Sequence, residues 1–326
     1  MKAIIFEHYG APDVLKFVEL DKPVPQPNEV LVKVNAAALN AADWHVMRGK
    51  PYFMRLMFGL TKPKINRFGC DLAGVVESVG EEVEDFKIGD EVYGEVTGKN
   101  FDGFGAFREY LCVSPEDLTI KPTNLSFEEA AAVPLAAMSA LQGLRKGNLR
   151  AGEHLLINGA SGGVGTYAVQ LAKVIGAKVT AVCSTSKMDL VKSLGADEVI
   201  DYKAIDFVES GMLYDMIFAV NGTRPLMHYK KALKPQGRYV MCGGGNRQLF
   251  EVQFLGGILS KKNGQQFHTL MAKSQKEDMI FLKELIESGD LKPVIDRTYP
   301  LKETSKAMEY LEEGHARGKI VLHIAN

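Results

Sequence analysis

The chain has little cysteine and lacks any long apolar run. Its four cysteines stand far apart in 326 residues, with no Cys-x-x-Cys pair among them. This spacing favours reduced thiols over a disulfide framework or a closed zinc cage. No apolar run reaches the roughly 18 residues that a bilayer-spanning helix needs, and the opening MKAIIFEHYG is unlike a signal peptide. We therefore expect a cytoplasmic protein.

An excess of charge of one sign is also lacking. Lysine and arginine number 39 against 40 for aspartate and glutamate, and no long basic run occurs. Proteins that bind nucleic acid or an anionic membrane usually carry a basic patch. We therefore expect neither of these partners, and a small molecule instead. The hydrophobic share of 46% is typical of a soluble globular chain, and the length favours two domains.

The first 120 residues contain short alternating or β-branched segments separated by glycine, proline and aspartate. This pattern indicates a β-barrel or a sandwich. The predicted strands in this part are 2–6, 30–34, 74–80, 90–96 and 107–113.

Helical and strand periods begin to alternate near residue 122. Strands separated by helices form right-handed βαβ units, so we predict a doubly wound α/β domain with a parallel sheet. Its predicted strands are 154–158, 178–183, 198–200, 214–220 and 238–242, and its helices are 128–146, 164–175, 187–194 and 224–233, the last after a Thr223 cap. Two tail helices, 277–288 and 302–313, precede a strand 319–324 that can return to the first domain.

The segment INGASGGVG joins strand 154–158 to the next helix. The turn needs a residue without a Cβ at Gly159, and a glycine at Gly165 lets the helix pack on the strand. The amides at the positive end of that helix can hold a pyrophosphate. The alternatives are a purely structural turn and a methyltransferase-like nucleoside site, which requires an acid after the second strand. The predicted cofactor residues here are Ser161, Gly162, Gly163, Val164 and Gly165.

The second strand, KVTAVC, ends without that acid. An NAD-preferring site has Asp or Glu there to bind the ribose 2′-hydroxyl, and this carboxylate repels a 2′-phosphate. Hydroxyls and a cation bind the phosphate instead. We therefore predict NADP(H) as the cofactor, with its 2′-phosphate held by Ser184, Ser186, Lys187 and Tyr202. The alternative is that the serines only cap the next helix.

A series of motifs runs through nearly the whole chain: MKAIIFEHYGAPDVL, EVLVKVNAAALNAADW, GCDLAGVVESVG, FKIGDEVYG, AAVPLAAMSAL, INGASGGVGTYAVQLAK, LGADEVIDY, LKPQGRYV and HARGKIVL. In this order they resemble the medium-chain dehydrogenase/reductase superfamily, in its zinc-free, quinone oxidoreductase-like branch. The resemblance implies a GroES-like β-barrel catalytic domain from residues 1–123 and 267–326, a Rossmann NADP-binding domain from 124–266, and an active site in the cleft.

Zinc-dependent relatives hold their metal through a cysteine, a histidine and a further cysteine. By resemblance, Asn40 stands at the first position and Cys70 at the second, followed by Asp71, while AAVPLAAMSAL offers no ligand for the third. Zinc needs convergent nitrogen or sulfur donors, so we predict no metal. The alternative is that His45 and Cys112 converge on Cys70, which would give a zinc-type alcohol dehydrogenase with atypical ligands.

Asn40 and Asp43 match an Asn-x-x-Asp pattern of the zinc-free branch, in which the asparagine lies by the nicotinamide and the substrate. An amide both donates and accepts hydrogen bonds, so Asn40 can orient a carbonyl oxygen. We expect Asp43 to pair with Arg48, because a buried carboxylate needs a partner. His45 and Tyr52 are the nearby groups that can supply a proton.

Further cofactor residues are expected where later strands end, because ligands of α/β sheets lie beyond the carboxyl ends of strands. By resemblance Lys319 faces a cofactor phosphate or ribose, with a solvated turn as the alternative. Segment 51–60 is either core or a lid over an apolar substrate. Segment 250–260 is predicted as an edge strand of a homodimer, with burial beneath the final helices as the alternative. The strand-end residues are Asn221, Gly222, Gly243 and Gly244.

These features predict an NADPH-dependent oxidoreductase that transfers hydride, without zinc, to an apolar quinone or α,β-unsaturated carbonyl. Without zinc there is no Lewis acid to lower the pKa of an alcohol substrate, so we expect reduction of a carbonyl compound and not oxidation of an alcohol. The nicotinamide carries the chemistry, and the protein aligns the two reactants. Two alternatives stay open: a non-catalytic NADPH-binding sensor or interaction protein, and the zinc-type alcohol dehydrogenase.

Overall fold

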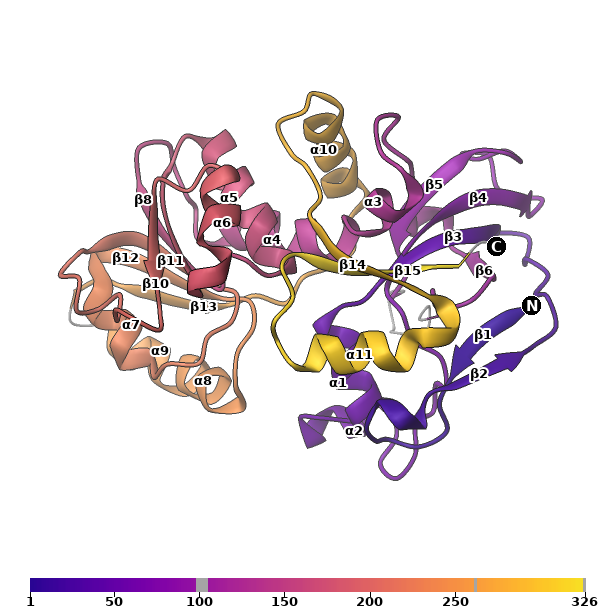
Figure 1. Ribbon diagram of the computed structural model, residues 1–326, viewed down its shortest axis with the longest axis horizontal. Coiled ribbons are helices and arrows are strands. Elements are labelled where there is room, and N and C mark those ends of the chain that lie inside the picture. The colour runs from indigo at the N-terminus through magenta and orange to yellow at the C-terminus, as the bar shows by residue number, and fades with distance from the viewer. Residues whose placement is uncertain (98–104, 261–262, 325–326) are drawn as a thin grey trace. The chain divides into compact units, whose positions relative to one another are not determined.

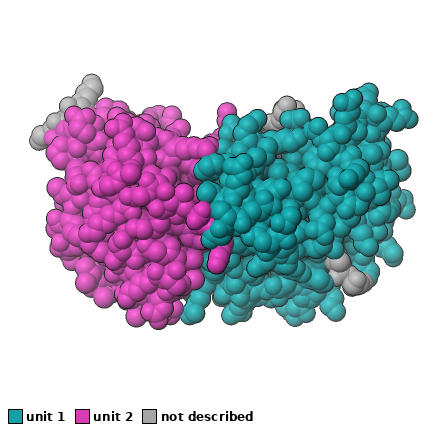
Figure 2. Space-filling view, turned by 90° about the horizontal axis from the view of Figure 1, so that it is seen from above, with its two compact units in different colours: residues 1–135, 274–289, 293–326 teal, residues 136–273, 290–292 magenta. Residues whose placement is uncertain are grey.

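The computed structural model describes residues 1–97, 105–260 and 263–324 (Figure 1). The chain divides into two compact units (Figure 2). Unit 1 consists of Met1–Leu135, Ser274–Gly289 and Pro293–Asn326, and unit 2 of Ala136–Lys273 and Asp290–Lys292. Among the described residues, no helix is long and apolar enough to cross a membrane.

Unit 2 contains a six-stranded sheet in which all neighbouring strands are parallel. Its spatial order, β10-β9-β8-β11-β12-β13, is doubly wound, because the direction of winding reverses between β8 and β11. This confirms the predicted Rossmann sheet. The strands are β8 (His154–Asn158), β9 (Lys178–Cys183), β10 (Glu198–Asp201), β11 (Tyr214–Ala219), β12 (Leu233–Met241) and β13 (Gln266–Thr269).

Helices lie on both faces of this sheet (Figure 1), so its central strands are buried almost throughout. The core includes the fully buried rings of Tyr214, Tyr229 and Tyr239. The helices are α4 (Pro134–Lys146), α5 (Gly163–Ile175), the 3₁₀ turn η4 (Thr185–Lys187), α6 (Met188–Ser193), α7 (Leu226–Ala232), α8 (Asn246–Phe250), the π-helix η5 (Glu251–Leu255) and α9 (Gly256–Ser260).

The prediction of an edge strand over 250–260 is wrong, because this segment is helical through η5 and α9. Its apolar residues follow a helical spacing: Phe250 and Phe254, four residues apart, stack with ring centroids 6.0 Å apart. The edge strand on this side of the sheet is instead β13, which pairs only with β12 among the described strands, and β10 forms the opposite edge.

Two predicted helices also differ from the structure. The segment 128–146 forms two helices, α3 (Phe127–Ala131) and α4, because Pro134 lacks an amide hydrogen and starts a new helix. Helix α7 begins after Pro225, so Thr223 is not its cap.

Unit 1 contains a sheet with the order β14-β15-β3-β4-β5-β7, in which β6 also pairs with β3, and a separate β1-β2 hairpin. The carboxyl-terminal strand β15 pairs antiparallel with β3, with Val321 opposite Ala38, so the chain end returns to this unit as predicted (Figure 1). The strands are β1 (Lys2–Ile5), β2 (Lys16–Glu19), β3 (Val30–Ala38), β4 (Asp71–Val79), β5 (Glu91–Glu95), β6 (Tyr110–Val113), β7 (Leu118–Ile120), β14 (Ile295–Pro300) and β15 (Lys319–His323).

The core of unit 1 contains three buried phenylalanines in edge-to-face contact. The Phe68 ring lies 5.5 Å from that of Phe6 and 5.0 Å from that of Phe107. The helices of the unit are α1 (Ala41–Arg48), η2 (Tyr52–Met54), α2 (Arg55–Phe58), α3, α10 (Lys276–Glu287) and α11 (Thr304–Glu312).

The limits of the units differ from the predicted domain limits at 123/124 and 266/267, because they lie at 135/136 and 273/274. Helix α3 contacts β3 and β4 of unit 1, and its Glu128 pairs with His323 of the same unit at 2.8 Å. Strand β13 belongs to the sheet of unit 2. Both features shift the limits toward the carboxyl terminus.

Candidate active site

The turn between β8 and α5 has the geometry of a phosphate-binding loop. Gly159 has a φ of +92°, and a Cβ on Gly165 would lie 2.2 Å from the Gly159 carbonyl oxygen, so both positions require glycine. A Cβ on Gly162 would meet nothing closer than 3.8 Å, so its backbone is open to approach. The amides that begin α5 can therefore bind an anion. Of the predicted residues, Ser161 and Gly162 lie in this turn, and Gly163, Val164 and Gly165 begin α5.

The loops after β11 and β12 lie together at the carboxyl edge of the sheet. The Gly222 amide donates to the Gly243 carbonyl oxygen at 2.9 Å, and Gly222 also pairs with Gly244. The Asn158 side chain at the end of β8 donates to the Asn221 carbonyl oxygen at 3.0 Å. The structure thus brings the four predicted strand-end residues to the point where the sheet reverses, which is where such sheets bind ligands.

The predicted 2′-phosphate residues follow β9 and β10. Ser184 precedes η4, and its side chain makes no capping hydrogen bond within that turn, which does not support the capping alternative. Ser186 is exposed and Lys187 half-buried. Tyr202 is 50% exposed, and its amide donates to the Cys183 carbonyl oxygen at 3.1 Å. Hydroxyls, a cation and a phenol therefore lie at adjacent strand ends.

Asp201, the last residue of β10, was not among the residues predicted for this site. The Thr185 hydroxyl donates to its carboxylate, and the Lys203 amide donates to the same carboxylate at 2.9 Å. The hydrogen bond from Thr185 is the main reason that the pKa of Asp201 lies below its usual value. The strand-end rule, applied to the third strand as well as the second, points to this residue.

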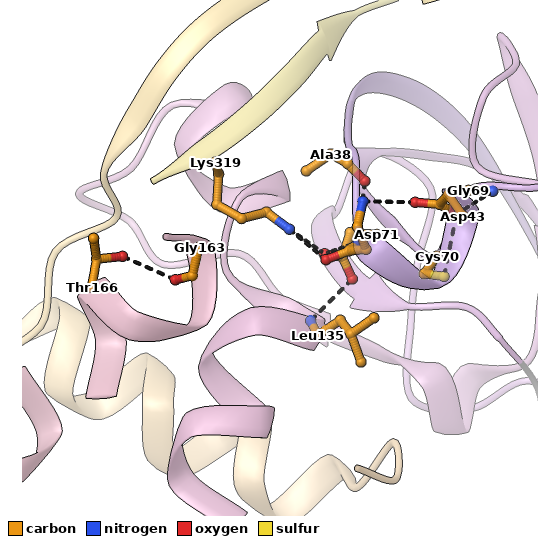
Figure 3. Close-up of polar contacts among 10 residues, drawn as sticks. Ala38, Asp43, Gly69, Cys70, Asp71, Leu135, Gly163, Thr166 and Lys319 are labelled. Atoms are coloured by element: carbon orange, nitrogen blue, oxygen red, sulfur yellow. Dashed lines mark hydrogen bonds and ion pairs between the residues drawn. The ribbon is translucent and has the colours of Figure 1, made fainter. Parts of the chain in front are cut away.

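In unit 1 the side chains of Asn40, Asp71 and Lys319 form a buried polar network. Figure 3 labels Asp71 and Lys319 of this network. The Asn40 amide donates to Asp71 at 2.9 Å and to the Ala38 carbonyl oxygen at 3.3 Å. The Lys319 ammonium donates to the Asn40 side-chain oxygen at 2.6 Å and to Asp71 at 3.4 Å. The Leu135 amide donates to the other Asp71 oxygen at 3.0 Å.

This network fixes the orientation of the Asn40 amide, which accepts from an ammonium on one side and donates to a carboxylate on the other. Burial raises the pKa of Asp71, while Lys319 and Asn40 act in the opposite sense. Lys319 is only 3% exposed, so its side chain does not lie in a solvated turn, which was the alternative to a role at the cofactor. The contact between Lys319 and Asn40 was not predicted, because the two residues are 279 positions apart in the chain.

The predicted Asp43–Arg48 ion pair is wrong. Arg48 forms a two-pronged pair with Glu312, at 2.7 and 2.6 Å. Asp43 lies at the start of α1, where it accepts the Asn40 backbone amide at 2.8 Å and the Gly69 amide at 3.0 Å. Residues five apart do not share a helix face, so Asp43 and Arg48 point to different partners. Burial raises the pKa of Asp43 to about 7.

The residues at the zinc position of the family do not fit a zinc ion. Burial raises the pKa of the Cys70 thiol well above its usual value, so the thiolate that zinc requires is disfavoured. The Lys319 ammonium already supplies a positive charge beside Asn40 and Asp71. Within the described segments, no group of three or more His, Cys, Asp or Glu side chains is placed to hold a metal.

His45 and Tyr52 do not join the Asn40 network. The His45 ring nitrogen Nδ1 lies 2.7 Å from the Lys50 carbonyl oxygen, and burial lowers the pKa of the imidazole. Tyr52 is 67% exposed, and its ring lies 5.0 Å from the Arg55 guanidinium. Asn40 caps the start of α1, whereas His45 lies in its last turn and Tyr52 follows its end.

Buried Glu95 gives unit 1 a testable pH dependence. Burial raises the pKa of Glu95 from 4.5 to about 8, so between these values the native state holds a proton that the unfolded chain has lost. Stability therefore falls as the pH rises through this window. Glu95→Gln keeps an oxygen for the Thr97 amide and removes the titration. The free energy of unfolding of the variant should fall less steeply with pH than that of the unmodified protein. The two slopes should differ by about 1.4 kcal/mol per pH unit. Denaturant unfolding at several pH values measures this, and identical slopes would contradict it.

Comparison with known proteins identifies the family. Residues 26–123 match the alcohol dehydrogenase GroES-like domain, and residues 194–322 match the zinc-binding dehydrogenase family. The chain is 40% identical over 333 residues to a 2-methylene-furan-3-one reductase of Solanum lycopersicum, covering 99% of this chain and 79% of the relative. It is 38% identical over 338 residues, with the same coverage of 99% and 79%, to an NADPH-dependent alkenal/one oxidoreductase, chloroplastic, of Arabidopsis thaliana.

Among solved structures, the quinone oxidoreductase from Coxiella burnetii is similar, with a TM-score of 0.86, 30% identity, and coverage of 100% of this chain and 99% of that one. The fold, the glycine turn and these matches agree in confirming the expected GroES-like and Rossmann architecture. The chain therefore belongs to the medium-chain dehydrogenase/reductase superfamily, in its quinone oxidoreductase-like branch.

Proposed function

We propose that the protein is an NADPH-dependent reductase of α,β-unsaturated carbonyl compounds. The observation that carries the proposal is the end of β9, where two serines and a lysine stand in place of the acid of an NAD site. The names of the relatives at 40% and 38% identity support this substrate class and NADPH. A quinone is the second candidate acceptor, supported by the Coxiella burnetii structure.

When bound, the reduced nicotinamide supplies a hydride to the β-carbon of the enone. The carbon–carbon double bond is lost, and the resulting enolate takes a proton at its α-carbon from water or a hydroxyl. The turn after β8 is proposed to hold the pyrophosphate, and Ser184, Ser186, Lys187 and Tyr202 the 2′-phosphate. The nicotinamide half is assigned to Asn221, Gly222, Gly243 and Gly244.

Asn40 is the proposed substrate-orienting residue. One of its amide protons is held by Asp71, while the other makes only a 3.3 Å contact with the Ala38 carbonyl oxygen. A substrate carbonyl oxygen can compete for that second proton. Lys319 has a third N–H that can donate a hydrogen bond to a cofactor phosphate or ribose oxygen. Tyr52 is the first candidate proton donor, since its hydroxyl makes no hydrogen bond with a described residue, and His45 is the second.

Lys187→Ala is expected to weaken NADPH binding roughly 10-fold and to leave NADH binding nearly unchanged, because one charged hydrogen bond to the 2′-phosphate is lost. Titration of the reduced-nicotinamide fluorescence measures both affinities. Lys192→Ala is the matched control, since Lys192 is an exposed lysine farther along α6. Equal losses for the two cofactors would remove Lys187 from the phosphate site.

The turnover test uses purified protein with NADPH and a panel of enones and quinones, with and without a chelator. We expect NADPH oxidation that depends on an enone and is insensitive to the chelator. Tight NADPH binding without turnover of any acceptor would favour the non-catalytic sensor instead. Loss of activity in the chelator would favour a metal-dependent enzyme.

A homodimer and a cytoplasmic location are also proposed. Phe250, Phe254 and Leu255 are 57%, 68% and 43% exposed, and this apolar surface supports self-association. Gel filtration tests the dimer, and a monomer at micromolar concentration would contradict it. Cell fractionation tests the location.

A further inference from the structure

Exposed apolar side chains gather on one short segment of unit 1, formed by η2 and α2. Their spacing of three to four residues places them on one side of the helical turns, while Met54 and Phe58 pack against the core. Val24 and Ile88 are exposed singly elsewhere in the unit, which is ordinary. The apolar face consists of Phe53, Leu56, Met57 and, just after the end of α2, Leu60, which are 52%, 71%, 56% and 67% exposed.

The charged side chains within the segment that carries this face are all basic. Between Asp43 and Asp71 the chain has no acidic residue and six basic ones, although its net charge is -1. Arg48 is paired with Glu312. The side chains of Lys50, Lys62 and Lys64 are exposed and form no ion pair with any described residue. These three lysines therefore stand beside the apolar face with uncompensated charge.

Arg55 fixes the segment that carries the apolar face to the rest of unit 1. Its guanidinium lies 4.5 Å from the Tyr9 ring centroid and donates to the Gly49 carbonyl oxygen at 3.1 Å. The Tyr9 hydroxyl in turn donates to the Gly59 carbonyl oxygen at 2.8 Å. These polar contacts, together with the packing of Met54 and Phe58 on the core, anchor the inner side of the segment.

We propose that the apolar face and the three lysines dock unit 1 on the surface of an anionic lipid bilayer. Aromatic and aliphatic side chains enter the boundary between headgroups and acyl chains, and adjacent lysines attract anionic headgroups. The expectation of no membrane partner was based on the net charge and on the lack of a long basic run, whereas the basic residues between Asp43 and Asp71 are spaced out along the segment that carries the exposed apolar face. This inference does not depend on the proposed reductase activity.

The experiment is co-sedimentation of the full chain with vesicles of phosphatidylcholine alone or mixed with phosphatidylglycerol. We expect binding to the mixed vesicles only, and release by salt. Lys62→Gln/Lys64→Gln should weaken binding roughly 25-fold, since each lysine near an anionic surface contributes about 1 kcal/mol. Leu56→Ser/Met57→Ser should also weaken binding, but without changing its salt dependence.

The matched control is Lys87→Gln/Ile88→Ser, an exposed cation and an exposed apolar residue elsewhere in unit 1, and it should bind like the unmodified chain. Equal sedimentation with both vesicle types, or equal losses in the control, would overturn the proposal. A dimer that dissociates in Leu56→Ser/Met57→Ser, without vesicle binding, would assign the face to a second copy instead. Reduction of a water-soluble enone by Lys62→Gln/Lys64→Gln, without vesicles, tests the proposed function separately and should be unchanged.

Discussion

Ser184→Asp is expected to reverse the cofactor preference, weakening NADPH binding roughly 100-fold or more while strengthening NADH binding. The substitution removes a hydroxyl from the predicted phosphate site, and a hydrogen bond to a charged group contributes about 1.5–3 kcal/mol. It also adds a carboxylate that repels the 2′-phosphate and accepts the 2′-hydroxyl of NADH. Titrations with each reduced cofactor, read by nicotinamide fluorescence or by quenching of the lone Trp44, give the two affinities.

Ser184→Asn is the matched control for this variant, because it has the shape of the aspartate without its charge. It should weaken NADPH much less than Ser184→Asp and gain little for NADH. The Asp201 carboxylate already accepts hydrogen bonds from the Thr185 hydroxyl and the Lys203 amide. The difference between the aspartate and asparagine variants therefore reports on the carboxylate added at position 184. Unchanged affinities in both variants would place the 2′-phosphate elsewhere.

Lys319→Met is expected to destabilise unit 1 by about 3–5 kcal/mol, because it leaves the fully buried Asp71 carboxylate without its cation. Asp71 then takes up a proton more readily, so its folded pKa lies further above the unfolded value. The native variant binds the extra proton at acid pH, and its stability falls as the pH rises. The gap to the unmodified protein should therefore widen with pH, as thermal or denaturant unfolding would measure.

Lys319→Met/Asp71→Asn separates this charge effect from lost packing. Removing both charges should restore much of the stability and abolish the added pH dependence. A double variant as unstable as Lys319→Met would show that the lysine side chain acts mainly by filling space. An unaltered single variant would contradict the buried ion pair itself.

The architecture could be predicted because local patterns of apolar, glycine and serine residues indicate where its strands begin and end. Strands β8 and β9 match the predicted ranges in both limits, since buried strands followed by glycine or serine turns have clear ends. The segment 250–260 could not be assigned by the same means, because a short apolar run has no distinctive period and tertiary contacts choose its conformation. Strand β14 was missed because its six residues include Asp, Arg and Pro and lack apolar alternation.

The grouping of the residues proposed to bind the nucleotide could be predicted for a related reason. These residues follow consecutive strands, and the carboxyl ends of parallel strands lie at one edge of a sheet. The Asn40 network was not predictable as a network, because Asp71 and Lys319 come from β4 and β15, which meet only through the pairing of both with β3. The Arg48–Glu312 pair likewise joins residues 264 positions apart, and the nearer Asp43 was a misleading choice of partner.

The central claim is hydride transfer from NADPH to the β-carbon of an enone, and isotope labelling tests it most directly. The reaction is run with NADPH carrying deuterium at C4 of the nicotinamide, on each face in turn, and the product is examined by NMR. We predict that one labelled face delivers deuterium to the β-carbon, while the α-carbon takes its hydrogen from solvent. A reduced product without deuterium at the β-carbon from either face, or no reduced product, would contradict the account.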